Sequence, residues 1–378
     1  MPRMTTPLTM IAATAACLLA ACATSGFAAG NPPRHAAGHG TAYVVSPFGT
    51  VTPIRTATNI AGRPIKVPSV PLYVAVSPHG RTAYVVAGND SVIPIDTFTN
   101  RAERRIQLPS YPTPDGIGIT PNGKTAYIVH DNGTVTPIST ATNHVGKQIK
   151  TPVGSGPYTL TIAPNSATVY VLDWSTGSIT PVTTATGKPG KPFRIRGARF
   201  IAITPDSKTM YATSDRNTVT PVNLATDRPG KPIKVGRGSD DLDITPDGKT
   251  VYVVNGLANS VTPINTATNK AGKAIKVGPG PAGMAITPNG RTLYVVDARI
   301  GTRYGGDSIT PINTATNKAG KAIKVGHEPA AIAITPNGRT AYVVNFRSGT
   351  VTPISTANNL AGKPIKVGLQ PLGIAITA

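Results

Sequence analysis

The residues of this 378-residue chain that could do chemistry are few and form no known catalytic pattern. Among the six histidines only His35 and His39 have a spacing typical of metal ligands, and the chain contains no GxSxG, CxxCH or phosphate-loop motif. Cysteine occurs only at positions 17 and 22, so residues 23–378 offer no thiol for a disulfide, a metal or a nucleophile. The sequence therefore predicts no metal, no cofactor and no catalytic residue.

A second set of candidates consists of polar and aromatic residues that interrupt an otherwise repetitive sequence. Such residues, gathered at one end of a repeat array, could form a ligand pocket, and free variation of loop residues is the alternative. The candidate ligand-face residues are Trp174, Arg199, Asp240, Asp241, Arg299, Arg303, Tyr304, Asp307, His327, Glu328, Phe346 and Arg347. The neighbouring Asp240 and Asp241 are expected in a solvated loop, and the adjacent His327 and Glu328 are expected to point apart.

The elements that must position these residues repeat along the chain. A tyrosine within a T-x-Y-V-V-like segment recurs about every 42 residues, a period typical of repeat folds. The eight copies are Tyr43, Tyr84, Tyr127, Tyr170, Tyr211, Tyr252, Tyr294 and Tyr342. In the unit that begins at Ser239, strand-like runs cover residues 242–245, 250–254, 260–265 and 274–277. The loops between them are too short for a crossover helix, so each unit is predicted to be a four-stranded antiparallel meander.

The apolar pattern of one unit indicates how the sheets pack. Val251 and Val253 point to one side of the second run, Tyr252 and Val254 to the other, so neither face is polar. Small sheets buried on both faces must be sandwiched between neighbours, which predicts an all-β protein, a β-propeller. Residues 372–377 form a first run that would complete the sheet begun at residue 41 and hide its edges. We predict eight blades, with seven as the alternative.

The third run of each repeat unit contains a proline, which cannot donate a hydrogen bond to a neighbouring strand. These residues are Pro53, Pro94, Pro137, Pro181, Pro221, Pro263, Pro311 and Pro353. We expect the fourth strand to be short and to stop pairing near this proline.

The N-terminal segment is predicted to be a targeting signal. Residues 1–22 contain a short apolar stretch that ends in Leu19-Ala20-Ala21-Cys22, which resembles a bacterial lipobox and implies lipidation of Cys22. An ordinary signal peptide cleaved further on, for example after Ala28, is the alternative. Residues 23–40 are rich in Gly, Ala and Pro and are predicted to be a flexible tether, and residues 41–378 to be one propeller domain. This predicts an extracytoplasmic protein, lipid-anchored to the outer face of the plasma membrane, or secreted.

The charge of the chain is strongly positive, with a formal net charge of +21. Many of the basic residues lie in the fourth run and in the loop before it, which a propeller places at its outer edge. The predicted basic rim is Lys147, Lys150, Lys231, Lys234, Lys270, Lys273, Lys276, Lys318, Lys321, Lys324, Lys363 and Lys366. Such a rim suits an anionic polymer, and protection of exposed strand edges by lysine is the alternative. Aromatic residues, on which nucleic-acid bases would stack, make up only 5% of the chain.

The repeat also resembles a known family. The pattern TPDGKTVYVVN…SVTPINTATNKAGKAIKVG is similar to the YVTN-type propeller repeat of bacterial YncE-like proteins. The resemblance covers almost all of residues 41–378 and implies a secreted or surface propeller, with nucleic-acid binding in one member and redox-enzyme domains among distant relatives. The Thr-Pro pair in the third run departs from the usual pattern, which weakens any transfer of function.

Taken together, these patterns predict a monomeric, non-enzymatic binding or interaction scaffold at the cell envelope, with an anionic envelope polymer or a protein as its partner. Two alternatives remain open. One is a propeller enzyme of the lactonase or lyase type, which would need Asp240, Asp241, His327 and Arg303 together at the mouth of the central channel. The other is a nucleic-acid-binding propeller.

Overall fold

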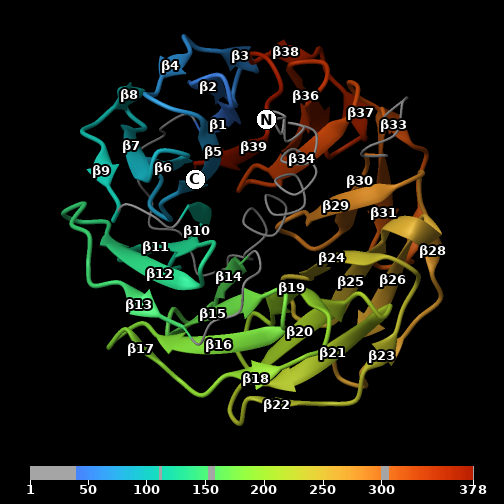
Figure 1. Cartoon of the computed structure of the whole chain (residues 1–378). Helices are drawn as coiled ribbons and strands as arrows, with labels where there is room; N and C mark the ends of the chain where they lie inside the picture. The colour runs from blue at the N-terminus through green and yellow to red at the C-terminus, as the bar shows by residue number, and fades with distance from the viewer. Residues whose placement is uncertain (1–39, 110–112, 152–157, 299–305, 378) are drawn as a thin grey trace, which may run out of the picture.

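The computed structural model describes residues 40–109, 113–151, 158–298 and 306–377. These residues form eight antiparallel sheets arranged as blades around a central axis (Figure 1). The prediction of an eight-bladed β-propeller is confirmed, and the seven-bladed alternative is wrong. A single turn of 3-10 helix, η1 (Gly256–Ala258), is the only helix in the described ranges.

Each blade has an innermost strand, two middle strands and an outer strand. The innermost strands of blades 1 to 8 are β39 (Gly373–Ile376), β5 (Pro71–Val76), β10 (Pro114–Ile119), β14 (Tyr158–Ile162), β19 (Ala198–Ile203), β24 (Ser239–Ile244), β29 (Pro281–Ile286) and β34 (Pro329–Ile334). The second strands are β1 (Thr41–Ser46), β6 (Thr82–Ala87), β11 (Thr125–His130), β15 (Thr168–Asp173), β20 (Thr209–Ser214), β25 (Thr250–Asn255), β30 (Thr292–Asp297) and β35 (Thr340–Asn345). The third strands are β2 (Thr50–Arg55), β7 (Ser91–Asp96), β12 (Thr134–Ser139), β16 (Ser178–Thr183), β21 (Thr218–Asn223), β26 (Ser260–Asn265), β31 (Ser308–Asn313) and β36 (Thr350–Ser355).

The outer strand is split into two short pieces in seven of the eight blades. These pieces are β3 (Ile60–Ala61) and β4 (Ile65–Lys66), β8 (Arg101–Ala102) and β9 (Ile106–Gln107), β17 (Lys188–Pro189) and β18 (Phe193–Arg194), β22 (Arg228–Pro229) and β23 (Ile233–Lys234), β27 (Lys270–Ala271) and β28 (Ile275–Lys276), β32 (Lys318–Ala319) and β33 (Ile323–Lys324), and β37 (Leu360–Ala361) and β38 (Ile365–Lys366). Blade 3 has β13 (Ile149–Lys150) and an isolated bridge between Ile138 and Val145.

The proline of the third strand explains this split. In blade 6, β26 pairs with β27 on one side of Pro263 and with β28 on the other. The outer strand is therefore interrupted at the proline, where the N–H needed for a strand hydrogen bond is missing. The Pro263 carbonyl instead accepts a hydrogen bond from the Gly272 N–H at 2.8 Å. The expectation of a short outer strand that stops pairing near the proline is confirmed, with pairing resumed beyond it.

The ring is closed by pairing between the two ends of the described chain. Strand β39 lies beside β1 in blade 1, with Ala42 opposite Ile376 and Val45 opposite Gly373. The Thr41 N–H also donates to the Thr377 hydroxyl at 2.8 Å. The C-terminal strand therefore completes the N-terminal blade, as predicted, and every innermost strand contacts an innermost strand on either side.

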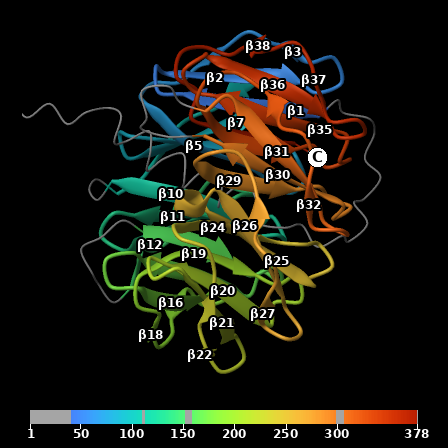
Figure 2. The same cartoon turned by 90° about the vertical axis from the view of Figure 1, so that its right-hand side faces the viewer.

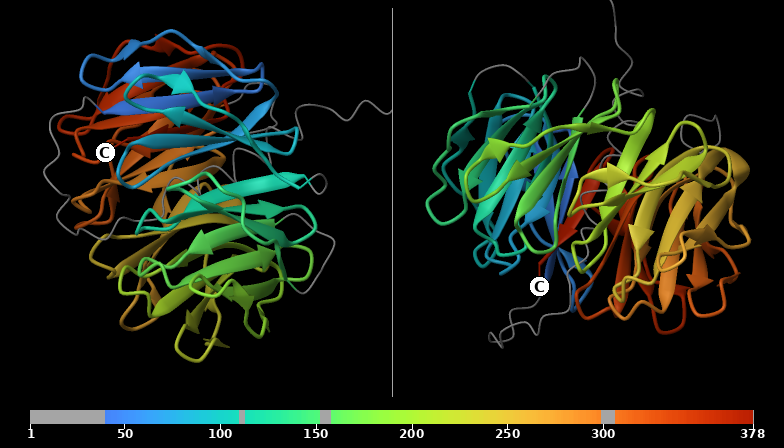
Figure 3. Two further views of the ribbon diagram at one scale, coloured as in Figure 1. Left: turned by 90° about the vertical axis from the view of Figure 1, so that its left-hand side faces the viewer. Right: turned by 90° about the horizontal axis from the view of Figure 1, so that it is seen from below.

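The views from the side show neighbouring blades packed face to face (Figure 2; Figure 3). The hydrophobic core lies in layers between these blades. Tyr252 and Val254 of blade 6 pack against Leu293 and other residues of blade 7. Val251 and Val253 face the opposite way and pack with residues of blade 5. The alternation read from the sequence is confirmed, because both faces of the sheet are buried.

A tyrosine–asparagine hydrogen bond joins neighbouring blades in addition to this packing. The Tyr252 hydroxyl donates to the Asn317 Oδ1 in the next blade at 2.7 Å. Asn317 can take this position because it adopts a left-handed conformation (φ 53°), which asparagine tolerates better than most residues. The same bond joins Tyr43 to Asn100, Tyr84 to Asn143, Tyr211 to Asn269, Tyr294 to Asn359 and Tyr342 to Asn59.

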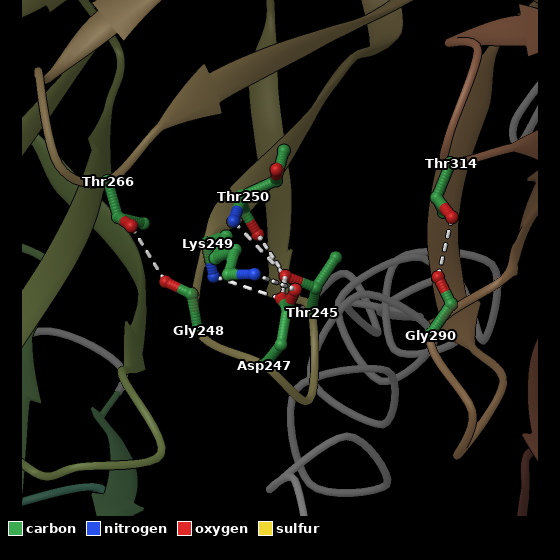
Figure 4. A network of polar contacts seen from close by, with 8 residues as sticks. All are labelled: Thr245, Asp247, Gly248, Lys249, Thr250, Thr266, Gly290 and Thr314. Atoms are coloured by element: carbon green, nitrogen blue, oxygen red, sulfur yellow. Dashed lines mark hydrogen bonds and ion pairs between the residues drawn. The ribbon is translucent and has the colours of Figure 1, made fainter.

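The hairpins between the first and second strands are fixed by their own side chains. In blade 6 the Thr245 hydroxyl donates to the Asp247 Oδ1 at 2.6 Å, and the Lys249 N–H donates to the same oxygen at 3.1 Å (Figure 4). Gly248 takes the positive φ of 71° that the turn requires. The Thr266 hydroxyl donates to the Gly248 carbonyl at 2.7 Å, which ties the loop after the third strand to this turn. These connections make up one end of the ring, the hairpin face.

The opposite end, the loop face, is built from the loops between second and third strands and the segments that lead into the innermost strands. Backbone hydrogen bonds join these two kinds of segment, for example from Asp215 to Gly197 at 2.9 Å. The predicted signal with Cys22, residues 23–39 of the predicted tether, and Arg299, Arg303 and Tyr304 lie outside the described residues.

Candidate functional site

The predicted basic rim lies on the outer strands and in the segments between their two pieces, and all twelve lysines are exposed. In β28 the side chain of Ile275 is buried and that of Lys276 is exposed, as the alternation of a strand dictates. Outer strands of adjacent blades touch, for example β23 with β27 and β28 with β32. The lysines of blades 5 to 8 therefore form one continuous belt.

Few of these charges are neutralised by partners. Four ion pairs are found among the described residues, and only one, between Lys324 and Asp307 at 4.0 Å, involves the rim. A groove of about 530 Å³ on the same edge lies between blades 1 and 2, and Arg63, Lys66 and Arg101 are among its lining residues. The rim is thus an exposed surface of mostly unpaired positive charge.

On the loop face, the structure brings three of the predicted residues near one another at the junction of blades 4, 5 and 6. Trp174 and Arg199 line a pocket of about 390 Å³, and Asp240 interacts electrostatically with Arg199. The lining residues are Trp174, Ser175, Thr176, Arg194, Arg196, Gly197, Arg199, Asp215 and Arg216. Four arginines and one aspartate make the lining strongly positive.

Arg199 lies between two carboxylates. Its Nη2 is 3.9 Å from the Asp215 Oδ2. Burial raises the pKa of Asp240, and the positive charge of Arg199 partly offsets this effect. Gly197 has a positive φ of 76°, and a Cβ there would lie 2.0 Å from the Asp215 Oδ1, so any other residue would strain the backbone and displace the Asp215 carboxylate.

Trp174 lies partly buried at the edge of the pocket. Its ring meets that of Phe200, on β19, edge to face at 5.4 Å. It also packs against the core layer between blades 4 and 5, the layer between blades 5 and 6, and the large cluster of blades 1 to 3. The indole N–H is buried without a hydrogen-bond acceptor, which is uncommon for a tryptophan.

The expectation that Asp240 and Asp241 lie in a solvated loop is wrong. Both belong to the innermost strand β24, and Asp241 is only 2% exposed because its side chain faces the adjacent strand β29. The Asp241 carboxylate accepts hydrogen bonds from the N–H groups of Leu242, at 2.9 Å, and Met284. Burial raises the pKa of Asp241 to about 7. Asp243, two residues along, is buried in the same way with its pKa raised well above the usual value.

The remaining described candidates lie in blades 7 and 8. The Glu328 carboxylate pairs with the Arg347 Nε at 3.3 Å, and its carbonyl accepts the Phe346 N–H at 2.9 Å. The His327 N–H donates to the Ser348 hydroxyl at 2.8 Å. His327 thus belongs to blade 8 and Asp240 to blade 6, while Asp241 is enclosed between strands. Of the described members of the enzyme set, Asp241 is therefore buried away from the channel mouth, and Asp240 and His327 come from different blades.

Four charged residues of the pocket were not among the sequence candidates. Arg194 and Arg196 belong to the outer edge of blade 4 by their place in the repeat, and Asp215 and Arg216 follow the second strand of blade 5. A signal was present, because Arg194-Ile195-Arg196 stands where most repeats read Lys-Val-Gly. Asp243 was also missed, although other repeats have Ala, Gly or Thr at its position.

Two further properties concern the described residues only. They contain no group of three or more His, Cys, Asp or Glu side chains arranged to hold a metal ion. None of their helices has the length and apolar character needed to cross a membrane.

Comparison with known proteins supports the fold and no closer relationship. No protein-family model and no curated protein matches the sequence. Among solved structures, the chain is similar to the dihydro-heme d1 dehydrogenase NirN in complex with DHE, with a TM-score of 0.75 and 15% identity over 91% of this chain and 77% of that one. It is also similar to apo AztD from Citrobacter koseri, with a TM-score of 0.67 and 12% identity over 89% and 98% of the two chains.

Hydrazine synthase of Kuenenia stuttgartiensis is a third similar structure, with a TM-score of 0.60 and 22% identity over 76% of this chain and 96% of that chain. At these identities the likeness establishes the propeller fold alone.

Proposed function

We propose that this protein is a non-enzymatic binding scaffold of the cell envelope that holds an anionic polymer along its basic rim. The observation that carries the proposal is the continuous belt of exposed lysines on the outer strands of blades 5 to 8, of which one, Lys324, has an ion-pair partner among the described residues. A polyanion laid along this belt would release its condensed counterions, which favours binding at low salt. Wall teichoic acid is a polymer of this chemistry.

The location of the protein is part of the same proposal. The Leu19-Ala20-Ala21-Cys22 segment resembles a lipobox, and the repeat resembles the YVTN type of secreted or surface propellers. Lipidation of Cys22 would hold the protein at the outer face of the plasma membrane, and residues 23–40 would tether the propeller to the anchor. The rim would then face the envelope polymers around it.

A titration of the purified protein with teichoic acid and with single-stranded DNA, over a range of salt concentrations, tests the proposal. We expect log K to fall linearly with log salt concentration, and teichoic acid to bind at least as tightly as DNA. A variant with Lys273→Glu, Lys276→Glu, Lys321→Glu and Lys324→Glu should bind at least tenfold more weakly and show a smaller salt slope.

The matched control changes the same net charge on the hairpin face, through Arg81→Glu, Lys124→Glu, Lys208→Glu and Lys249→Glu. If the rim and hairpin variants lose affinity equally, binding follows net charge and not the belt. If the wild type binds neither polymer, the lysines serve only to keep strand edges from pairing. Preference for DNA would instead assign the rim to nucleic acid.

A further inference from the structure

The pocket between blades 4 and 5 has a chemistry different from that of the rim. Its positive charge comes from four guanidinium groups gathered around one cavity, whereas the rim carries lysines spread along an edge. Guanidinium groups are planar and present several donors at fixed angles, which suits a carboxylate or a phosphate. The lining therefore favours a compact anion over a long polymer.

The four arginines differ in how far they are already engaged. The Arg194 Nε donates to the Thr176 carbonyl at 2.6 Å, which holds this side chain against the loop of blade 4. Arg199 faces Asp215 at 3.9 Å. Arg196 and Arg216 form no ion pair with any described residue, and both are exposed. The guanidinium groups of Arg196 and Arg216 are thus free to bind an incoming anion, and that of Arg194 is held in place beside them.

Trp174 gives the pocket one aromatic wall. Phe200 packs against the ring and limits its motion. The indole N–H is itself buried, so it lies out of reach of a ligand in the pocket. The ring therefore offers such a ligand an apolar contact beside the guanidinium groups.

From these observations we propose that the pocket binds a small organic anion, a carboxylate or a phosphate ester of about one ring, through Arg196, Arg199 and Arg216, with Trp174 as the neighbouring aromatic wall. The volume of about 390 Å³ is near the lower end of the range for small-molecule sites. Asp215 competes with the ligand for Arg199. The site goes beyond the polymer-binding rim and is independent of it, because the two share none of the rim lysines.

The chain contains a built-in probe, because Trp174 is its only tryptophan. The experiment follows the tryptophan emission of the purified protein during titration with citrate, glucose 6-phosphate and inorganic phosphate, at constant ionic strength. Glucose serves as the uncharged control. We expect a saturable change in emission with citrate or glucose 6-phosphate and none with glucose. The anion that binds with the higher affinity shows whether the pocket prefers a carboxylate or a phosphate ester.

Charge substitutions of opposite sign separate binding from a structural effect. The double variant Arg196→Gln, Arg216→Gln should lower the affinity for the anion at least tenfold. The Asp215→Asn variant should raise this affinity severalfold, because a competing carboxylate is removed. The matched control, Lys363→Gln with Lys366→Gln, removes two charges from the rim and should leave the anion affinity unchanged.

Three outcomes would overturn the proposal: no saturable change with either organic anion, equal weakening in the pocket and rim variants, or weaker binding by the Asp215→Asn variant. Polymer binding by the rim is measured separately. A pocket variant that keeps its teichoic acid affinity and loses the small anion distinguishes failure of one site from failure of the other.

Discussion

At the scale of single residues, the buried carboxyl groups of strand β24 set this blade apart. Gly283 and Ala331 occupy the position of Asp241 in the two following innermost strands. In blade 6 this position holds a carboxyl group, which accepts hydrogen bonds from the N–H groups of Leu242 and Met284. Its Oδ2 remains buried without a partner, so ionisation of this group is unfavourable in the folded protein.

The raised pKa of Asp241, about 7 against the usual 3.8, makes stability depend on pH. Well below pH 3.8 the group is protonated in both the folded and the unfolded state, and burial carries no charge penalty. As pH rises towards 7 the unfolded chain loses the proton first, so this contribution to stability is progressively lost. The stability of the Asp241→Ala variant relative to the wild type should therefore rise by about 2–3 kcal/mol from pH 5 to pH 8.

Chemical denaturation at the two pH values measures this difference. Asp247→Ala is the matched control, because hydrogen bonding from Thr245, followed by that from Lys249, lowers the pKa of Asp247. Its contribution to stability is present above the unfolded pKa and is lost only in acid, so the effect of Asp247→Ala should be constant from pH 5 to pH 8. A constant effect for Asp241→Ala as well would contradict the assignment.

At the scale of the elements, neighbouring blades are joined by packing and by the tyrosine–asparagine hydrogen bond. Two junctions depart from this rule: blade 4 has Gly187 at the asparagine position, facing blade 3, and blade 5 has Asp227 there, facing blade 4. Its Oδ1 is buried without a partner, and burial raises its pKa. Burial, followed by the charge of Asp227, raises the pKa of Tyr170 to about 12. The junction of blades 4 and 5 thus carries an acid where six of the other junctions carry a neutral asparagine acceptor.

We therefore expect Asp227→Asn to stabilise the protein by about 1 kcal/mol, the usual contribution of one hydrogen bond. Asparagine also suits the left-handed conformation of this residue (φ 52°). Thermal melting at pH 7 would show a higher midpoint. In the Tyr170→Phe background the gain should vanish, since the hydroxyl that donates the new bond is gone. A gain that persists there would mean that only the loss of charge matters.

At the scale of the whole molecule, stability depends on closure of the ring by β39. This strand covers the edge of β1 and fills the space between β34 and β5. Deletion of residues 371–378 would expose the edge of blade 1 and uncover the inner strands on both sides. We expect the truncated protein to lose its cooperative thermal transition and to aggregate.

A rearranged chain provides the control for this prediction. When residues 369–377 are moved to the N-terminal side of Thr41 and joined to it by a Pro-Asp-Gly-Lys turn, blade 1 acquires the strand order of the other blades. This variant should keep a cooperative transition, because the same contacts form from the other end of the chain. If the truncated protein melts like the wild type, closure by β39 contributes nothing to stability.

The sequence by itself determined the repeat and therefore the architecture. The spacing of the tyrosines set the number of blades, alternation such as that of Val251 and Tyr252 required sheets buried on both faces, and Pro263 and its equivalents interrupted the outer strand. Position in the repeat was also enough to place the lysines on the rim. These features are local, so each unit states them again without reference to its neighbours.

Only the tertiary structure decided what the non-repeating residues do. Trp174 and Arg199 meet Arg196 and Arg216 because the end of one blade lies against the loop of the next, and no pattern within a single unit records that distance. The sequence predicts a loop carboxylate at Asp241, whereas in the structure this residue lies on β24 and is buried against β29, between two blades. The sequence assigns a residue to a face, whereas its partners and its burial depend on how closely adjacent blades pack.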